Sequence, residues 1–279
     1  MLQETKSNNA GQEVYGLRDT SFQRRMVRRS AEKQAAFFLP HLRPGMSLLD
    51  CGCGPGSITL GLAKRITPGT VVGVDFDPGE IERAQKLATE QGVTNVQFET
   101  GNVYELPFAD GTFDACFSNA LLDHLSDPIA ALREMRRVLK VEGVLGVRTA
   151  DRDGYLLAPA DPLLEKFGEW GEQRKNAQGV RVRIGKNIRA MLREAGFART
   201  EASASYDCYG TAEEVCGLAE SAAAGLSKKQ AKEQPGESGG PDRAETEAVA
   251  AAWRAWGESP DAFFAMSFCE GVGWCGAGE

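Results

Sequence analysis

The segment Leu48–Ser57, LLDCGCGPGS, combines an acidic residue with glycine at every second position. The glycines are Gly52, Gly54 and Gly56, and Asp50 stands two residues before the first of them. An apolar run leads into the segment, and a run typical of a helix follows it. A glycine turn between a strand and a helix lets a ligand approach the backbone closely. The segment therefore predicts a ligand-binding loop.

Two classes of ligand could use such a loop. A dinucleotide fingerprint has the spacing G-x-G-x-x-G, which would place its third glycine at residue 57. That residue is Ser57, and the spacing is instead D-x-G-x-G-x-G. The second predicted strand ends at Asp75, whose carboxylate could accept hydrogen bonds from ribose hydroxyls in either class. The glycines together with this acid indicate a ligand that contains a nucleoside.

Strands and helices alternate up to about residue 150. Short apolar runs indicate buried strands, and longer runs with one apolar face indicate helices. The predicted strands cover residues 46–52, 70–76, 95–102, 113–120 and 143–149, and the predicted helices cover 21–38, 57–66, 78–92 and 127–140. Apolar strands that alternate with helices predict a parallel sheet covered on both faces.

The second half of the chain is less regular. Helices are predicted at 161–175, 185–196, 211–226 and 244–257, and strands at 198–209 and 262–274. The segment 227–245 is polar and rich in glycine and proline, which predicts a mobile loop. Residues 1–13 are predicted to form a disordered tail.

Composition limits the classes of function. The chain has 279 residues, 42% of them hydrophobic, and a net charge of -7, so it can bury a core but is a poor general binder of nucleic acid. No apolar run reaches the roughly 18 residues of a membrane span, and the N-terminus has no apolar signal region. We therefore expect a cytoplasmic protein. The seven cysteines argue against a disulfide framework, and their spacing predicts no metal site.

The ordered motifs resemble the class I S-adenosylmethionine (SAM) methyltransferases, above all the group that includes the ubiquinone and menaquinone biosynthesis enzymes. The matching segments are LLDCGCGPGS, VVGVDFDPGEIERA, GNVYELPFADGTFDACFSNALLDHLSDPIAALREMRRVLK and EGVLGV. The resemblance implies a Rossmann-like α/β fold, with a seven-stranded, mostly parallel sheet, helices on both faces, and an N-terminal helix and C-terminal helical insertions as a lid. It implies one domain over residues 14–279, with a SAM-binding core at 39–150 and substrate or lid insertions at 150–200 and 208–260.

The same resemblance implies roles in binding SAM. Asp50, Gly52 and Gly54 would line its methionine part, Asp75 would bind both ribose hydroxyls, and Phe76 would lie against the adenine. The complete set of implied cofactor contacts is Arg29, Asp50, Gly52, Cys53, Gly54, Asp75, Phe76, Asn102, Val103, Asn119 and Ala120.

The remaining implied roles concern residues outside the glycine loop. Asn102 stands where the family usually has an aspartate, and its amide oxygen could still accept from the adenine amino group. Val103 would offer its backbone N–H to the adenine ring. Asn119 would lie under the sulfonium, and Arg29 would cap the SAM carboxylate.

The implied reaction is methyl transfer to an oxygen, carbon or nitrogen atom of a small molecule. An apolar or aromatic acceptor is expected, and an anionic one is the alternative. Tyr155, Trp170 and Arg174 are the candidate acceptor contacts, with core packing and a solvated basic face as the alternatives. His124 is the candidate general base, and a structural histidine is the alternative. A SAM-binding regulator without catalysis and an RNA or protein methyltransferase also stay open, as does a homodimer. The sequence SNAL stands where amino-group nucleic-acid methyltransferases carry an NPPY-type motif.

Overall fold

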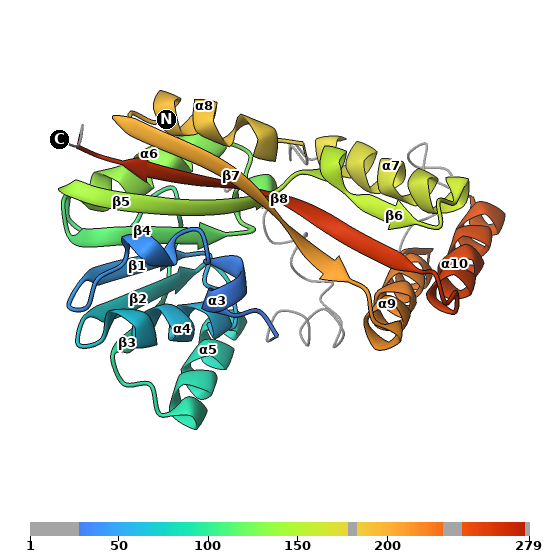
Figure 1. Ribbon diagram of the computed structural model, residues 1–279, viewed down its shortest axis with the longest axis horizontal. Coiled ribbons are helices and arrows are strands. Elements are labelled where there is room, and N and C mark those ends of the chain that lie inside the picture. The colour runs from blue at the N-terminus through green and yellow to red at the C-terminus, as the bar shows by residue number, and fades with distance from the viewer. Residues whose placement is uncertain (1–27, 178–182, 231–241, 277–279) are drawn as a thin grey trace, which may run out of the picture.

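A computed structural model describes residues 28–177, 183–230 and 242–276 of the chain. One mixed sheet forms its centre (Figure 1). The strands are β1 (Ser47–Cys51), β2 (Thr70–Asp75), β3 (Val96–Thr100), β4 (Phe113–Asn119), β5 (Leu139–Ala150), β6 (Leu156–Ala158), β7 (Arg199–Tyr209) and β8 (Phe263–Trp274).

The strand order confirms the predicted sheet. β3, β2, β1, β4 and β5 lie side by side and are parallel. β8 follows β5 in the antiparallel direction, and β7 pairs with the other edge of β8. These are the seven strands of a mostly parallel sheet. The short β6 is an eighth strand, which pairs with β8 beyond the end of β5.

Helices cover both faces of the sheet, as predicted. The helical elements are α3 (Ala31–Gln34), η1 (Leu39–His41), α4 (Ser57–Ile66), α5 (Pro78–Gln91), η2 (Leu122–His124), α6 (Pro128–Val138), η3 (Arg152–Gly154), α7 (Pro162–Ala177), η4 (Gly185–Asn187), α8 (Ile188–Glu194), α9 (Ala212–Gln230) and α10 (Arg243–Gly257). α3, α4 and α5 pack on one face, and α6 and α8 pack on the other. None of the helices in the described ranges is long and apolar enough to cross a membrane.

Local sequence signals set both ends of α5. The side chain of Asp77 accepts a hydrogen bond from the Gly79 N–H at 2.8 Å, with Pro78 in the first turn of α5. Gly92 ends the same helix in the left-handed conformation. Such caps satisfy backbone groups that have no partner inside the helix. This explains why the sequence predicts α5 almost residue by residue.

Two sequence predictions need correction. The helix predicted over 21–38 is only one turn in its described part, because Ser30 is extended and its N–H donates to the Gln34 side chain at 2.8 Å. The loop predicted over 227–245 is too long at both ends, since α9 continues to Gln230 and α10 begins at Arg243. Residues 1–13, 21–27 and 231–241 lie outside the described residues.

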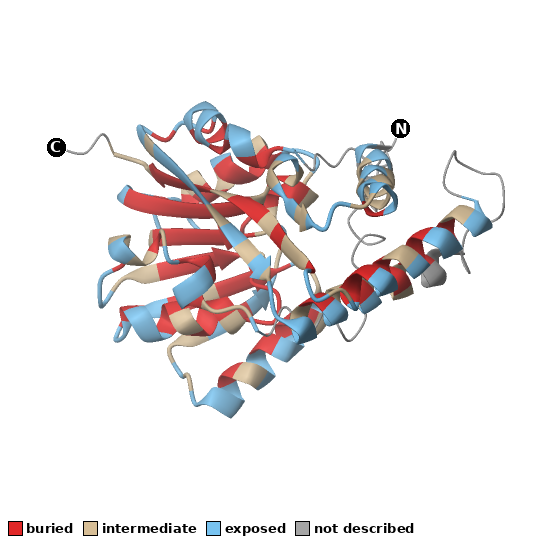
Figure 2. Cartoon of the chain, turned by 45° about the vertical axis from the view of Figure 1, so that its right-hand side comes forward, coloured by how far each residue is buried: buried red, intermediate tan, exposed pale blue. Residues whose placement is uncertain are grey.

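β6, α7, α9 and α10 form a helical lobe with an apolar core of its own (Figure 1). Leu164, Val215, Val249, Trp253 and Trp256 are among its buried side chains. Figure 2 shows buried residues along the central strands and exposed residues on the outer sides of the helices. Residues 185–199, which the sequence assigns to an insertion, do not join this lobe, because α8 packs beside α6 on the central sheet.

Candidate functional site

The glycine loop joins β1 to α4 in a conformation that favours glycine. Gly52, Gly54 and Gly56 have φ of +74°, +52° and +80°. L-residues with side chains rarely adopt these values. The N–H groups of Gly52 and Cys53 donate to the Val74 carbonyl at 2.7 and 3.0 Å, which holds the loop against the end of β2. The glycines therefore allow the chain to make this tight turn between β1 and α4, as the sequence predicts.

Gly56→Ala is expected to lower the free energy of unfolding by about 2–4 kcal/mol. The new Cβ would lie 2.9 Å from the side chains of Ala84 and Phe98, at a positive φ. Gly92→Ala is the matched control, because Gly92 has φ of +63° but no atom within 4 Å of an added Cβ. The control should lose only about 1 kcal/mol in urea unfolding. Equal losses in both variants would contradict the role of crowding at Gly56.

Asp75 lies at the end of β2 against the glycine loop. Its carboxylate accepts the Gly54 N–H at 2.9 Å on one oxygen and the Asp77 N–H at 3.0 Å on the other. Each carboxylate oxygen can accept more than one hydrogen bond, so the group can still bind ribose hydroxyls. The ring of Phe76, the next residue, is 40% exposed. This placement fits the nucleoside part of SAM.

Asn102 and Val103 follow the neighbouring strand, β3. The Asn102 side-chain oxygen accepts the Tyr104 N–H at 3.0 Å, which turns the chain at this point. Asn102 is exposed and Val103 is half-buried. Because β2 and β3 are parallel neighbours, these residues stand at the same edge as Asp75. The predicted adenosine contacts thus lie together.

Asp50 and Cys53 are buried below the loop surface. The Asp50 side chain is 2% exposed and accepts the Thr59 hydroxyl at 2.6 Å. Burial raises the pKa of Asp50 to about 7, against the effect of the Thr59 hydrogen bond and with a smaller contribution from Asp75. Burial likewise raises the pKa of the Cys53 thiol well above its usual range. Asp50 therefore braces the first turn of α4 as well as standing near the predicted methionine part of the site.

Asn119 and Ala120 follow β4, next to the glycine loop. Ala120 has a φ of +55°. No other non-glycine residue in the described part of the chain has a positive φ. A left-handed alanine is strained, and such strain is concentrated at functional sites. The Ala120 N–H donates to the Arg148 carbonyl at 2.7 Å.

Arg148 is a site residue that the sequence analysis missed. Its side chain is 1% exposed, and its guanidinium donates to the Asn119 amide oxygen at 3.3 Å and to the Asp207 carboxylate at 2.7 Å. Glu270 lies 3.7 Å away, and the guanidinium stacks over the Phe268 ring at 3.7 Å. The signal was present in the sequence, since one arginine interrupts the apolar fifth strand, GVLGVRT.

Arg29 lies near the same cluster. Burial lowers the pKa of Arg29, whereas the Asp207 carboxylate raises it and the Arg148 guanidinium lowers it. The Gln34 amide from the same N-terminal segment donates to Asp207 at 3.4 Å. The structure therefore places Arg29 at the carboxyl edge of the sheet, as its predicted role requires.

His124 lies beside a buried acid. Its Nε2 is 3.6 Å from the Asp123 carboxylate, which also accepts the Thr149 hydroxyl at 3.3 Å. His124 is partly exposed, at the end of η2 just after β4. The pair could accept a proton, although the hydrogen bonds of Asp123 also suit a structural role.

The three predicted acceptor contacts lie in different surroundings. Tyr155 is exposed at the start of β6, with its ring 6.1 Å from the Phe264 ring. Trp170 is half-buried, packs against the core of the helical lobe, and has the Lys166 ammonium 5.2 Å from its ring centre. Arg174 lies in α7, but its side chain is outside the described residues. Arg183, nine residues after Arg174, pairs with Asp153 at 2.5 Å and with Glu172 at 2.6 Å.

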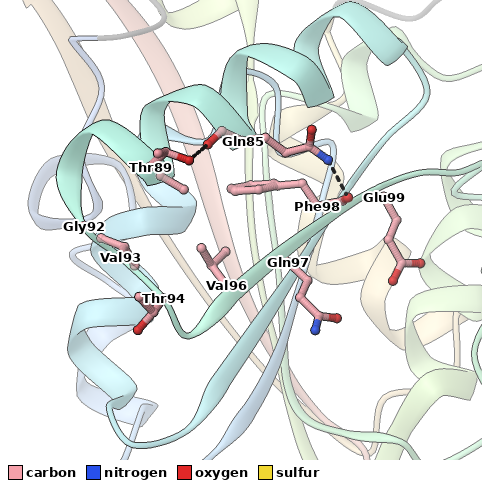
Figure 3. A pocket seen from close by; sticks show the side chains of 10 residues that line it. Gln85, Thr89, Gly92, Val93, Thr94, Val96, Gln97, Phe98 and Glu99 are labelled. Carbon is pink, nitrogen blue, oxygen red and sulfur yellow. Dashed lines mark hydrogen bonds between the residues drawn. The ribbon is translucent and has the colours of Figure 1, made fainter.

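A surface hollow lies away from these residues, between α5 and β3 (Figure 3). Within it the Gln85 amide donates to the Phe98 carbonyl and the Thr89 hydroxyl donates to the Gln85 carbonyl. The full lining is Gln85, Ala88, Thr89, Gly92, Val93, Thr94, Val96, Gln97, Phe98 and Glu99. No predicted site residue belongs to this lining, so the hollow is separate from the candidate site.

Comparisons with known proteins agree with this geometry. Residues 42–196, more than half of the chain, match the family described as a methyltransferase domain. An uncharacterized methyltransferase of Schizosaccharomyces pombe is 31% identical over 193 residues, which cover 65% of this chain and 68% of that protein. The demethylmenaquinone methyltransferase of Lactiplantibacillus plantarum is 36% identical over 132 residues, which cover 47% of this chain and 53% of that enzyme.

The chain spans about half the length of the Lactiplantibacillus plantarum enzyme and of other curated relatives that it matches. Among solved structures, the YcgJ protein of Bacillus subtilis has a TM-score of 0.58 at 20% identity, with 88% of this chain and 100% of that protein covered. That likeness shows the fold. The chain belongs to the methyltransferase-domain family and is a Rossmann-like, SAM-dependent methyltransferase.

Proposed function

We propose that the methyl acceptor is a small molecule that binds between the carboxyl ends of β4 and β5 and the helical lobe. The observation that carries this proposal is the path of β8. It pairs with β5 through Phe268–Trp274 and continues past the end of β5 to pair with β6. The lobe therefore stands beyond the edge where open α/β sheets bind their ligands. The demethylmenaquinone enzyme among the relatives also acts on a small molecule, as its name states.

An apolar or aromatic acceptor is favoured by the side chains on this part of the sheet. The Tyr209 ring lies 5.9 Å from the Phe264 ring, which also neighbours Tyr155. None of the three rings is fully buried. The pairing of Tyr209 with Phe264 and of Asp207 with Met266 places these rings on the same face as the Arg148–Asp207 pair. Aromatic side chains on a half-open surface suit a planar ligand.

Bound SAM supplies a methyl group that its sulfonium already activates. The chain's residues must then hold the cofactor, align the acceptor and exclude water. Asp75 would bind the ribose, and Asn119 would lie beside the methionine part of SAM. His124, beside Asp123, would be the general base for an acceptor that has to lose a proton. An acceptor that is already ionised would need no such base.

Tyr155→Ala is expected to lower the turnover of the acceptor about tenfold or more, because the acceptor would lose an aromatic contact. S-adenosylhomocysteine binding should stay unchanged. Candidate acceptors are first found by thermal shift in the presence of S-adenosylhomocysteine and then assayed with radiolabelled SAM. Tyr206→Ala is the matched control, because Tyr206 is exposed on the opposite face of β7.

Two outcomes would count against the proposal. Equal turnover in the Tyr155 and Tyr206 variants would show that the acceptor does not bind on this face of the sheet. Methylation of RNA or protein, without any small-molecule acceptor in the screen, would replace the proposed class of substrate.

A further inference from the structure

We propose that Arg148 is a positioning residue, which orients the Asn119 side-chain amide so that its NH₂ group binds the carboxylate of the cofactor. The guanidinium of Arg148 donates to the Asn119 Oδ1 at 3.3 Å, to the Asp207 carboxylate at 2.7 Å and to the Ser205 hydroxyl at 3.2 Å. Arg148 is almost completely buried, and its ion pair with Asp207 holds it in one place. This role of Arg148 in cofactor binding does not depend on the proposed acceptor.

The chemistry of arginine decides which way the amide faces. A guanidinium carries only hydrogen-bond donors, so the Asn119 atom beside it must be the oxygen. The NH₂ group then points away from Arg148. Among the residues that the structure describes, none accepts a hydrogen bond from this NH₂ group. Asn119 is 8% exposed, so a ligand in the site can still reach the amide.

The register of the sheet places Asn119 at the amino-acid end of the cofactor. Asp50 of β1 pairs with Phe117 of β4, so Asn119 stands level with Gly52. Asp75 and Asn102 lie at the ends of β2 and β3, on the other side of β1. With the nucleoside over β2 and β3, the amino-acid end of SAM would lie over β1 and β4. A carboxylate accepts strongly from an amide NH₂ group there.

Arg29 is a second donor for the same carboxylate. No carboxylate among the described side chains lies within 4 Å of the Arg29 guanidinium, although Asp207 is close enough to act on its charge. Asp207 in turn binds Arg148 and Gln34. Arg148 thus links Asn119, β7 and the N-terminal segment into one arrangement. A loss of Arg148 should release the amide even where Arg29 stays in place.

Calorimetry with two probes tests the proposal without an acceptor. S-adenosylhomocysteine carries the amino-acid end, and 5′-methylthioadenosine lacks it. Arg148→Met and Asn119→Ala should each weaken S-adenosylhomocysteine binding about tenfold and leave 5′-methylthioadenosine binding unchanged. The double variant should bind no more weakly than Asn119→Ala, because Arg148 acts through Asn119.

Ser205→Ala is the matched control, since it removes another hydrogen bond of Arg148 without touching Asn119. It should bind both probes as the wild type does. Asn119→Asp carries the test if Arg148→Met does not fold, because a carboxylate keeps the bond to Arg148 but has no donor. This variant should also lose affinity for S-adenosylhomocysteine alone.

Three results would overturn the proposal. The first is unchanged S-adenosylhomocysteine affinity in Asn119→Asp. The second is a double variant whose loss equals the sum of the two single losses. The third is an equal loss of affinity for both probes in Arg148→Met, which would indicate a general disturbance of the site.

Discussion

Asp75→Ala is expected to weaken S-adenosylhomocysteine binding by about 10²- to 10⁴-fold. The carboxylate would make two charge-assisted hydrogen bonds to the ribose, each worth about 1.5–3 kcal/mol. The same variant frees the Gly54 N–H, which Asp75 now accepts at 2.9 Å, so the glycine loop also loses an anchor. Isothermal titration calorimetry measures the effect directly.

Glu99→Ala is the control for the loss of one negative charge near the site. Glu99 lies on β3 beside Val74, and its side chain is exposed. The control should bind S-adenosylhomocysteine as the wild type does. Unfolding by urea should show that the Asp75 variant is still folded. An unchanged dissociation constant for a folded Asp75→Ala protein would exclude the ribose role.

Asp50 is expected to make the protein less stable as the pH rises from about 4 to about 7. Burial raises the pKa of Asp50 from 3.8 to about 7 in the folded state, so the folded protein holds this proton when the unfolded chain has released it. The stabilisation is fully present below the unfolded pKa and is lost as the pH rises through the folded pKa. The complete loss amounts to about 4 kcal/mol.

Asp50→Asn should remove this pH dependence, since an amide cannot ionise but can still accept the Thr59 hydroxyl. The unfolding free energy of the variant, relative to the wild type, should therefore increase with pH across this window. Asp114→Asn is a control, because its unfolding free energy relative to the wild type should decrease as the pH rises. Partial burial alone would raise the pKa of Asp114, but hydrogen bonds from Lys140 and Ser47 lower it. A stability difference between Asp50→Asn and the wild type that does not change with pH would contradict the prediction.

The order of strands and helices up to β5 could be predicted because its signals are local. The apolar runs of β1, β2 and β4, the proline and glycine at the ends of α5, and the glycine loop all lie within a few residues of the structure they specify. The position of Asp75 could be predicted for the same reason, since Asp75 is the last residue of β2. Periodicity and caps act over one or two turns, so they can be read without the fold.

The N-terminal segment shows where local signals failed. Its sequence has the periodicity of a helix over 21–38, yet α3 covers only Ala31–Gln34 in the described part. There Gln34 binds both the Ser30 backbone and Asp207 of β7. Tertiary contacts of this kind override helix propensity, which is worth only tenths of a kcal/mol per residue.

The sequence by itself determined the family, the cofactor and the glycine turn after β1, because these depend on short motifs in a fixed order. Only the tertiary structure decided how the rest of the site is built. Arg148 and Asp207 are 59 residues apart, and Gln34 and Asp207 are 173 apart, yet they form one cluster. The burial that raises the pKa of Asp50 and the passage of β8 into the helical lobe are equally non-local. Sequence patterns report on residues that are neighbours along the chain. Burial and ion pairing depend instead on which distant segments the fold brings together.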